Sequence, residues 1–156
     1  MQVKLPKMSK REIEELIERQ MLCRIAFKGV DYPYVAPFQY VYMNGTLFFH
    51  FTDYGKKMKL AEKDDRVCVE IEEFKPDLSE YNFVVLRGRL ATVTDAKEKA
   101  EAITRMANEG RKKLSPNFLA AHGFRRQEGW SSLSPEEPLV IMKLIDVVGK
   151  MGVKSP

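Results

Sequence analysis

The sequence predicts a mainly β protein, a six-stranded antiparallel barrel that is closed or nearly closed, with α-helices at its periphery. Six segments are rich in aromatic and β-branched residues, short turn signals join the first three, and helix-capping patterns flank the strand-rich regions. The six predicted strands are 22–27, 32–43, 46–51, 66–74, 81–94 and 138–149. The length of 156 residues fits one domain spanning 1–156.

The first sixty residues predict a helix followed by a meander of three strands. Ser9 and Glu12 have the spacing of a capping box, and apolar residues recur on one helical face, which predicts a helix over 10–20. The dipeptide Asn44-Gly45 stands between two aromatic-rich runs, which is a strong hairpin signal. The next segment, GKKMKLAEKD over 55–64, suits a short helix.

The second half predicts two more strands, a longer helix and a closing strand. Val67, Val69 and Ile71 alternate with more polar residues, and Gly88 interrupts the following apolar run, where we expect a bulge or bend. Asp95 with Glu98 predicts a second capping box for a helix over 95–110. Residues 111–137 are predicted to be irregular and basic.

Composition excludes several classes of protein. At 44% hydrophobic and 31% charged residues the chain is typical of globular proteins, and no segment reaches the roughly 18–20 apolar residues of a membrane span. No signal-peptide pattern opens the chain, so we expect a cytoplasmic protein. Cys23 and Cys68 are expected to be buried thiols. Two histidines are too few for a multi-histidine metal site within one chain, so no metal is predicted. The net charge of +4 permits anionic ligands without requiring them.

The turn before the short helix is the first candidate binding element. Lys56 and Lys57 follow Tyr54-Gly55 and open the helix, where free N–H groups and a partial positive charge favour a phosphate. An ordinary junction with a solvated first turn is the alternative. His50, at the end of the preceding strand, fits either a hydrogen-bonding residue of the core or a ligand or base.

Two other segments each allow two interpretations. The run YPYVAPFQYVYM carries two prolines, which predicts an irregular edge strand or a strand whose free backbone groups bind a planar polar ring. The basic and aromatic stretch 111–127 fits a solvated loop or, as the weaker alternative, a nucleic-acid contact. Trp130 follows this stretch and is a candidate for packing at an interface. Several strands are apolar on both faces, which predicts a second burial surface and favours a homodimer.

Taken in order, these segments resemble the FMN-binding split-barrel family related to pyridoxamine-phosphate oxidase. LCRIAF is similar to the first barrel strand of that family, and YPYVAPFQYVYMNGTLFFHF to its proline-bearing strand, hairpin and histidine-ended strand. GKKMKLAEKDDRVCVEI is similar to its phosphate-binding turn and strand entry, and FVVLRGRLATVTD to its glycine-bearing strand. The resemblance is good over 21–95 and weaker beyond.

The resemblance implies an FMN site at a dimer interface. Lys56 and Lys57 would bind the flavin phosphate, and the strand from residue 36 to 40 would run beside the isoalloxazine ring. The implied cofactor-binding residues are Ala36, Pro37, Phe38, Gln39, Tyr40, His50, Phe51, Thr52, Lys56, Lys57 and Asn82.

The resemblance also has departures that limit the functional prediction. The chain ends VGKMGVKSP, without the arginine- and tryptophan-rich segment of the oxidase proper, so we do not expect pyridoxamine-phosphate oxidase activity. We predict an FMN-dependent oxidoreductase that passes electrons or hydride between a reduced donor and a small acceptor, with no catalytic residue assigned. The alternative is a non-catalytic binder of flavin, deazaflavin or haem with the same fold.

Overall fold

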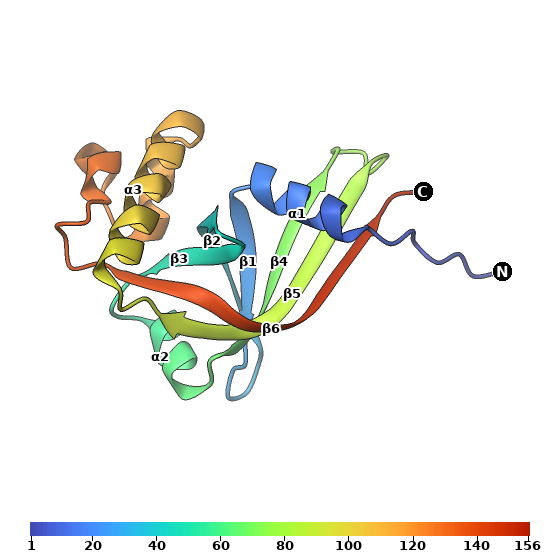
Figure 1. The fold of residues 1–156 in the computed structure, drawn as a ribbon, viewed down its shortest axis with the longest axis horizontal. Helices are drawn as coiled ribbons and strands as arrows, with labels where there is room; N and C mark the ends of the chain where they lie inside the picture. The colour runs from blue at the N-terminus through green and yellow to red at the C-terminus, as the bar shows by residue number, and fades with distance from the viewer.

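The computed structural model describes all 156 residues and contains six strands, three α-helices and three short 3-10 helices. Figure 1 shows the strands curved around one another, with α1 and α2 on opposite sides and α3 standing beside them. In chain order the elements are α1 (Lys10–Arg19), β1 (Leu22–Phe27), β2 (Tyr34–Met43), β3 (Thr46–Phe51), α2 (Lys56–Lys63), β4 (Arg66–Phe74), β5 (Tyr81–Thr92), α3 (Ala96–Lys113), η1 (Pro116–His122), η2 (Arg126–Glu128), η3 (Trp130–Ser132) and β6 (Val140–Lys154).

The six strands form a closed antiparallel barrel in the order β1-β2-β3-β6-β5-β4, which confirms the predicted fold class. The β2–β3 hairpin turns at Asn44 and Gly45, whose φ angles of 51° and 74° are those that a two-residue turn of this kind requires. Every neighbouring pair is antiparallel, and β1 closes the barrel against β4.

The barrel interior is filled by the side chains that point inward at alternate positions along each strand. Leu47, Phe49 and Phe51 of β3 belong to this core, as the alternation predicts. α1 adds three buried residues to it, namely Ile13, Leu16 and Ile17. The capping box at Ser9 and Glu12 is present, so this helix begins as the sequence predicts.

A second core lies outside the barrel, between the strands and α3. Phe48 and Ile141, on the outer face of β3 and β6, pack in this cluster with Ile103, Met106 and Trp130. The apolar outer faces of these two strands are therefore covered within the chain. The apolar outer faces of β3 and β6 therefore do not require a second copy of the chain, because α3 supplies the second burial surface there.

Four local expectations need correction. Glu98 does not complete a capping box, since its carboxylate accepts from Lys143 Nζ at 2.9 Å, although the Asp95 side chain does cap the helix. α3 continues to Lys113, and three 3-10 helices order the segment that was expected to be irregular. Trp130 is buried within the chain. Cys68, unlike Cys23, is only partly buried.

The predicted irregularity at Gly88 is present, and its extra residues lie in the neighbouring strand. Arg87 pairs with Gly149 and Arg89 with Ile145, so three residues of β6 oppose Gly88. A Cβ atom at Gly88 would lie 2.7 Å from the Ile145 carbonyl oxygen, which explains the need for glycine. None of the helices has the length and apolar character that a membrane-spanning segment needs.

Candidate functional site

The first turn of α2 offers a cationic and uncapped helix N-terminus. Its N-cap residue is Gly55, which has a φ of 96° and no side chain to accept from the first N–H groups. The first turn contains no acidic residue, and neither Lys56 nor Lys57 takes part in an ion pair. The donors and both positive charges are therefore free for an anion.

Both ammonium groups lie over aromatic rings at one end of the barrel. Lys56 Nζ is 4.8 Å from the centroid of the Tyr34 ring, and Lys57 Nζ is 4.9 Å from that of Phe38. Such cation–π contacts hold a lysine without consuming its charge. The structure thus places Lys57 beside the β2 segment that the sequence predicted to join it in one site.

The edge of β2 next to this turn is not paired with another strand. β2 pairs with β1 from Tyr34 to Gln39, but it pairs with β3 only from Tyr40 to Met43. The β3-facing edge of residues 34–39 therefore carries no strand ladder. Backbone groups on that edge are available to a planar polar ligand, which agrees with the interpretation of the proline-bearing strand.

The segment after η1 covers the end of β3. Gly123, with a φ of 83°, approaches Thr52 so closely that an added Cβ atom would lie 3.2 Å from the Thr52 methyl group. The Phe124 ring stacks on His50 with centroids 6.1 Å apart and an interplanar angle of 10°. The Thr52 hydroxyl donates to the Tyr54 carbonyl at 2.8 Å, which fixes the start of the turn.

A buried chain of side chains links β3, η1, β2 and α3. The Nδ1 atoms of His50 and His122 are 3.0 Å apart, His122 Nε2 is 2.7 Å from Gln39 Oε1, and Gln39 Nε2 donates to the Met106 carbonyl at 3.0 Å. All three side chains are at most 7% exposed. Because a carbonyl can only accept, the Gln39 amide nitrogen faces Met106 and its oxygen faces His122.

This orientation fixes the tautomers of both histidines. His122 Nε2 carries a proton and donates to Gln39, so Nδ1 of neutral His122 is bare and accepts from His50 Nδ1–H. Burial and the charge of Lys57 lower the pKa of His50 to about 4. Burial, His50 and Lys57 lower the pKa of His122 to about 3. Both rings are neutral at pH 7, and His50 keeps Nε2 as an acceptor.

The predicted site residues do not all gather at the lysine turn. Ala36, Phe38, Tyr40 and Phe51 point into the barrel, whereas Gln39 faces α3 and Pro37 is exposed. Any contact of these interior residues with a ring outside the barrel would therefore use their backbone.

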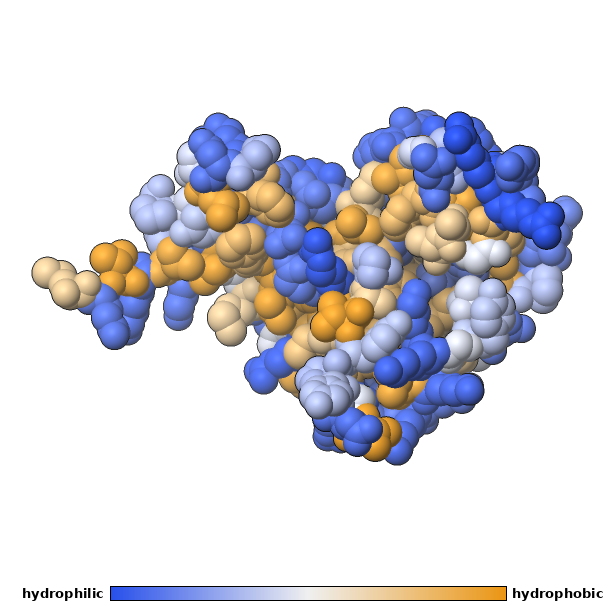
Figure 2. Space-filling model, turned by 180° about the vertical axis from the view of Figure 1, so that it is seen from behind, coloured by the Kyte–Doolittle hydropathy of each residue, from blue (hydrophilic) through white to orange (hydrophobic).

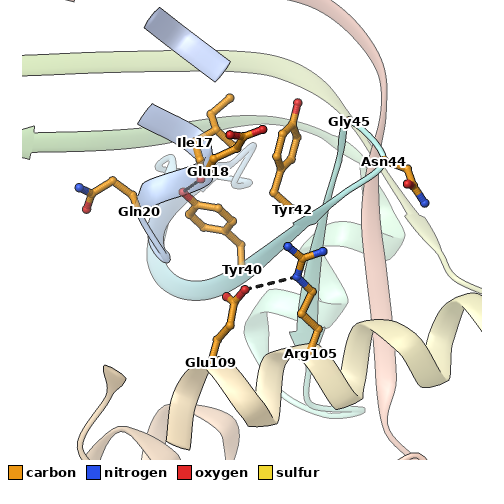
Figure 3. Close-up of a pocket in the computed structure, with 9 residues that line it drawn as sticks. All are labelled: Ile17, Glu18, Gln20, Tyr40, Tyr42, Asn44, Gly45, Arg105 and Glu109. Carbon is orange, nitrogen blue, oxygen red and sulfur yellow. Dashed lines mark hydrogen bonds and ion pairs between the residues drawn. The ribbon is translucent and has the colours of Figure 1, made fainter. Parts of the chain in front are cut away.

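Tyr40 is one of the predicted site residues whose side chain does not reach the lysine turn. Its hydroxyl donates to the Ile17 carbonyl at 2.7 Å, and its ring lines a cavity of about 470 Å³ between α1, the β2–β3 hairpin and α3. Figure 3 shows Tyr40 and Tyr42 in this cavity with the Arg105–Glu109 ion pair below them. No residue of α2 lines this cavity, so it is separate from the lysine turn.

Asn82 lies at the far end of the sheet from the lysine turn. It pairs with Glu73 at the end of β4, whereas α2 leads into Arg66 at the start of that strand. Glu73 lies seven residue steps beyond Arg66 along β4, or roughly 23 Å at about 3.3 Å per step. Asn82 and Lys57 of one chain therefore cannot contact the same phosphate or ring edge.

Sequence reasoning missed three contributors to the site: Tyr34, His122 and Phe124. Tyr34 begins the proline-bearing strand, and the aromatic residues of that strand could have suggested it as a site residue. No local pattern identified the partners of His50, because His122 lies 72 residues further along the chain. Only the docking of η1 on β3 brings them together.

Comparison with known proteins places this geometry in a family. Residues 9–126 match the family profile described as pyridoxamine 5'-phosphate oxidase. No curated protein matches the sequence.

Solved structures share the fold over nearly the whole chain. One is an FAD-binding protein from Mesorhizobium loti, with a TM-score of 0.72 and 19% identity, covering 99% of this chain and 100% of the other. A second is an FAD-binding protein from Mycobacterium smegmatis, with a TM-score of 0.64 and 17% identity, covering 97% and 98%. A third is General Stress Protein 26 from Bacillus anthracis, with a TM-score of 0.63 and 16% identity, covering 92% of each chain.

Proposed function

The chain belongs to the pyridoxamine 5'-phosphate oxidase family, and from this premise we propose that it binds a flavin, specifically FMN, and serves as an oxidoreductase. FMN when bound would supply the electron or hydride transfer between a reduced donor and a small acceptor. The names of the Mesorhizobium and Mycobacterium structures, both FAD-binding proteins, support a flavin ligand. The preference for FMN rests on the lysine turn.

The uncapped N-terminus of α2 is the single observation that carries the proposal. Two lysines with no carboxylate partner stand beside free N–H groups, where a dianionic phosphate finds both charge and donors. Lysine in this position opposes the helix dipole, and a bound phosphate removes that mismatch. The residues present thus fit the phosphate end of FMN.

The chain's other groups would hold the ring. The unpaired edge of residues 34–39 would hydrogen-bond the polar margin of the isoalloxazine, and Thr52 would lie along the ribityl chain. Bare Nε2 of His50 would accept a hydrogen bond there, in an orientation fixed by His122. Phe124 stacks on the His50 ring and would shield it from water when the flavin is bound.

We propose a homodimer with the site at the subunit interface. Asn82 lies far from the lysine turn of its own chain, so the proposal includes Asn82 as a residue that the second copy contributes to the pocket. Apolar side chains also remain exposed on the outside of the barrel, including Leu22, Val35 and Met151. Figure 2 shows apolar atoms across the middle of the face seen from behind. A second copy would cover such a surface.

The proposal is tested by comparing FMN with riboflavin, which lacks the phosphate. Lys56→Ala with Lys57→Ala should weaken FMN binding by at least about tenfold per lysine, since a charge-assisted hydrogen bond contributes about 1.5–3 kcal/mol. Riboflavin binding should change little. Lys59→Ala with Lys63→Ala removes the same charge from later turns of α2 and should leave FMN affinity nearly unchanged.

Three results would contradict parts of the proposal. Equal losses for FMN and riboflavin would assign the lysines another role. A purified protein that retains no flavin band after incubation with FMN and gel filtration would remove the cofactor. Retained flavin without oxidation of a reduced nicotinamide by any added acceptor would favour the non-catalytic binder over the oxidoreductase.

A further inference from the structure

The cavity of about 470 Å³ beside Tyr40 lies between α1, the β2–β3 hairpin and α3 (Figure 3). None of the residues that line it belongs to β1, β4, β5 or β6. A second copy on the outer face of those four strands is therefore compatible with an open cavity here. The volume lies within the range of roughly 300–1,000 Å³ that is usual for small-molecule sites.

Two tyrosine rings form the apolar part of the cavity. The Tyr40 hydroxyl donates to the Ile17 carbonyl at 2.7 Å, which fixes the ring and uses its donor within the chain. Tyr42 is partly buried on the same inner face of β2. Burial first, and then Glu14 and Glu18, raise the pKa of Tyr42, so its hydroxyl keeps its proton at pH 7. Together the rings offer a flat surface to an aromatic or aliphatic group.

One acid without a partner and one arginine with free donors line the cavity from different helices. Glu18, near the end of α1, takes part in no ion pair. Arg105 of α3 donates through Nε to Glu109 Oε1 at 3.3 Å, and its two Nη atoms have no acceptor. Figure 3 shows the Arg105 guanidinium directed toward Tyr42, with Glu18 on the α1 side of the same space. A free carboxylate and a free guanidinium edge are therefore both available to a ligand.

We propose that this cavity binds a small zwitterion of the amino-acid type with an apolar side chain. The carboxylate of the ligand accepts two hydrogen bonds from Arg105, because a guanidinium held at Nε by Glu109 still presents its two Nη atoms to a planar oxyanion. The ammonium of the ligand pairs with Glu18. The apolar side chain lies against the two tyrosine rings.

A ligand with only one charge cannot satisfy both charged groups of the cavity. A cation of the same shape can pair with Glu18, but it also meets the positive charge of Arg105. An anion can pair with Arg105, but it also meets the carboxylates of Glu18 and Glu109. Since like charges brought together in a site cost binding energy, the zwitterion should bind more tightly than either.

The inference goes beyond the proposed function and holds whether or not the lysine turn binds FMN. No residue of α2 lines the cavity. Tyr40 is the one predicted flavin-binding residue among those that do. Its ring faces this cavity, whereas a flavin outside the barrel would contact its backbone, so the two ligands need not compete.

Ligand-observed NMR titration of the full-length protein tests the inference, with and without saturating FMN. L-Phenylalanine is the probe. Phenethylamine retains only its ammonium group, and 3-phenylpropanoate retains only its carboxylate. L-Phenylalanine should bind at least about tenfold more tightly than either of them, with the same affinity in the presence and absence of FMN.

Two substitutions test the two ends of the ligand separately. Arg105→Gln should weaken the binding of phenylalanine at least about tenfold without weakening that of phenethylamine. Glu18→Gln should weaken phenylalanine by a similar factor without weakening 3-phenylpropanoate. Arg111→Gln and Glu15→Gln remove the same charges from α3 and α1 outside the cavity, and they should leave the affinity unchanged. The unfolding temperature of each variant shows that the proteins compared are folded.

Four outcomes would overturn the inference. The first is no binding of phenylalanine at millimolar concentration, and the second is equal binding of the amine or the propanoate. The third is an affinity for phenylalanine that survives Arg105→Gln or Glu18→Gln. The fourth is displacement of phenylalanine by FMN, which would assign the cavity to the flavin.

Discussion

Lowering the pH from 7 to 5 should destabilise the protein through its two buried histidines. The folded state keeps both rings neutral, since burial and Lys57 lower the pKa of His50 to about 4, and burial, His50 and Lys57 lower that of His122 to about 3. In the unfolded chain both return to about 6.5. The unfolded state therefore binds more protons below pH 6.5, and acid favours it.

The size of this effect follows from the separation of the pKa values. At pH values between the folded and unfolded pKa values, lowering the pH by one unit reduces the free energy of unfolding by about 1.4 kcal/mol per group. From pH 6.5 to 5 each histidine should therefore reduce stability by about 2 kcal/mol, or roughly 4 kcal/mol for the pair. The loss begins as the pH falls through 6.5 and is complete below the folded pKa values of about 4 and 3.

Glu70 changes stability in the opposite direction. Burial first, and then Glu72, raise the pKa of Glu70, so its folded form binds a proton more readily than the unfolded chain does. A comparison with His122→Gln cancels this contribution, because Glu70 is present in both proteins. Glutamine at 122 can also donate to Gln39 and accept from His50 without titrating.

Urea unfolding at pH 7, 6 and 5 measures the difference. The wild-type protein should lose about 2 kcal/mol more than His122→Gln between pH 7 and 5. The two histidine ring signals in the proton NMR spectrum of the folded protein should not titrate above pH 5. Identical pH dependences, or a histidine midpoint near 6.5, would refute the buried neutral pair.

Two further substitutions test local packing and capping. Gly110→Ala should destabilise the protein by about 1–2 kcal/mol despite the better helix propensity of alanine, because the new Cβ atom would lie 2.4 Å from the Trp130 ring. Thermal unfolding of Gly110→Ala in a Trp130→Phe background should show a smaller loss, and an additive result would exclude the clash as the cause. Ser9→Ala should reduce stability by about 1 kcal/mol, lowering the unfolding temperature by roughly 2–4 °C, because the capping box with Glu12 is lost. An unchanged unfolding temperature would show that the terminus of α1 contributes nothing to global stability.

Local sequence patterns predicted the elements of the barrel closely because each pattern acts within a few residues. The capping box at Ser9 fixed the start of α1, and Asn44-Gly45 fixed the hairpin. The lysine turn was also predictable, since Gly55, Lys56 and Lys57 are consecutive. The half-correct capping box at Asp95 shows the limit of such patterns, because Glu98 found a long-range partner in Lys143 instead.

The partners of the site residues were decided only by tertiary structure. Alternation along β3 shows that His50 points outward, but only the docking of α3 and η1 buries it against His122 and joins both to Gln39. The unpaired edge of β2 arises from how far β3 runs alongside it. The sequence by itself determined which segments are strands and where the cationic turn lies, because backbone conformation responds to near neighbours. Burial, hydrogen-bond partners and uncompensated charge depend on segments tens of residues apart, and closure of the barrel under α3 decided them.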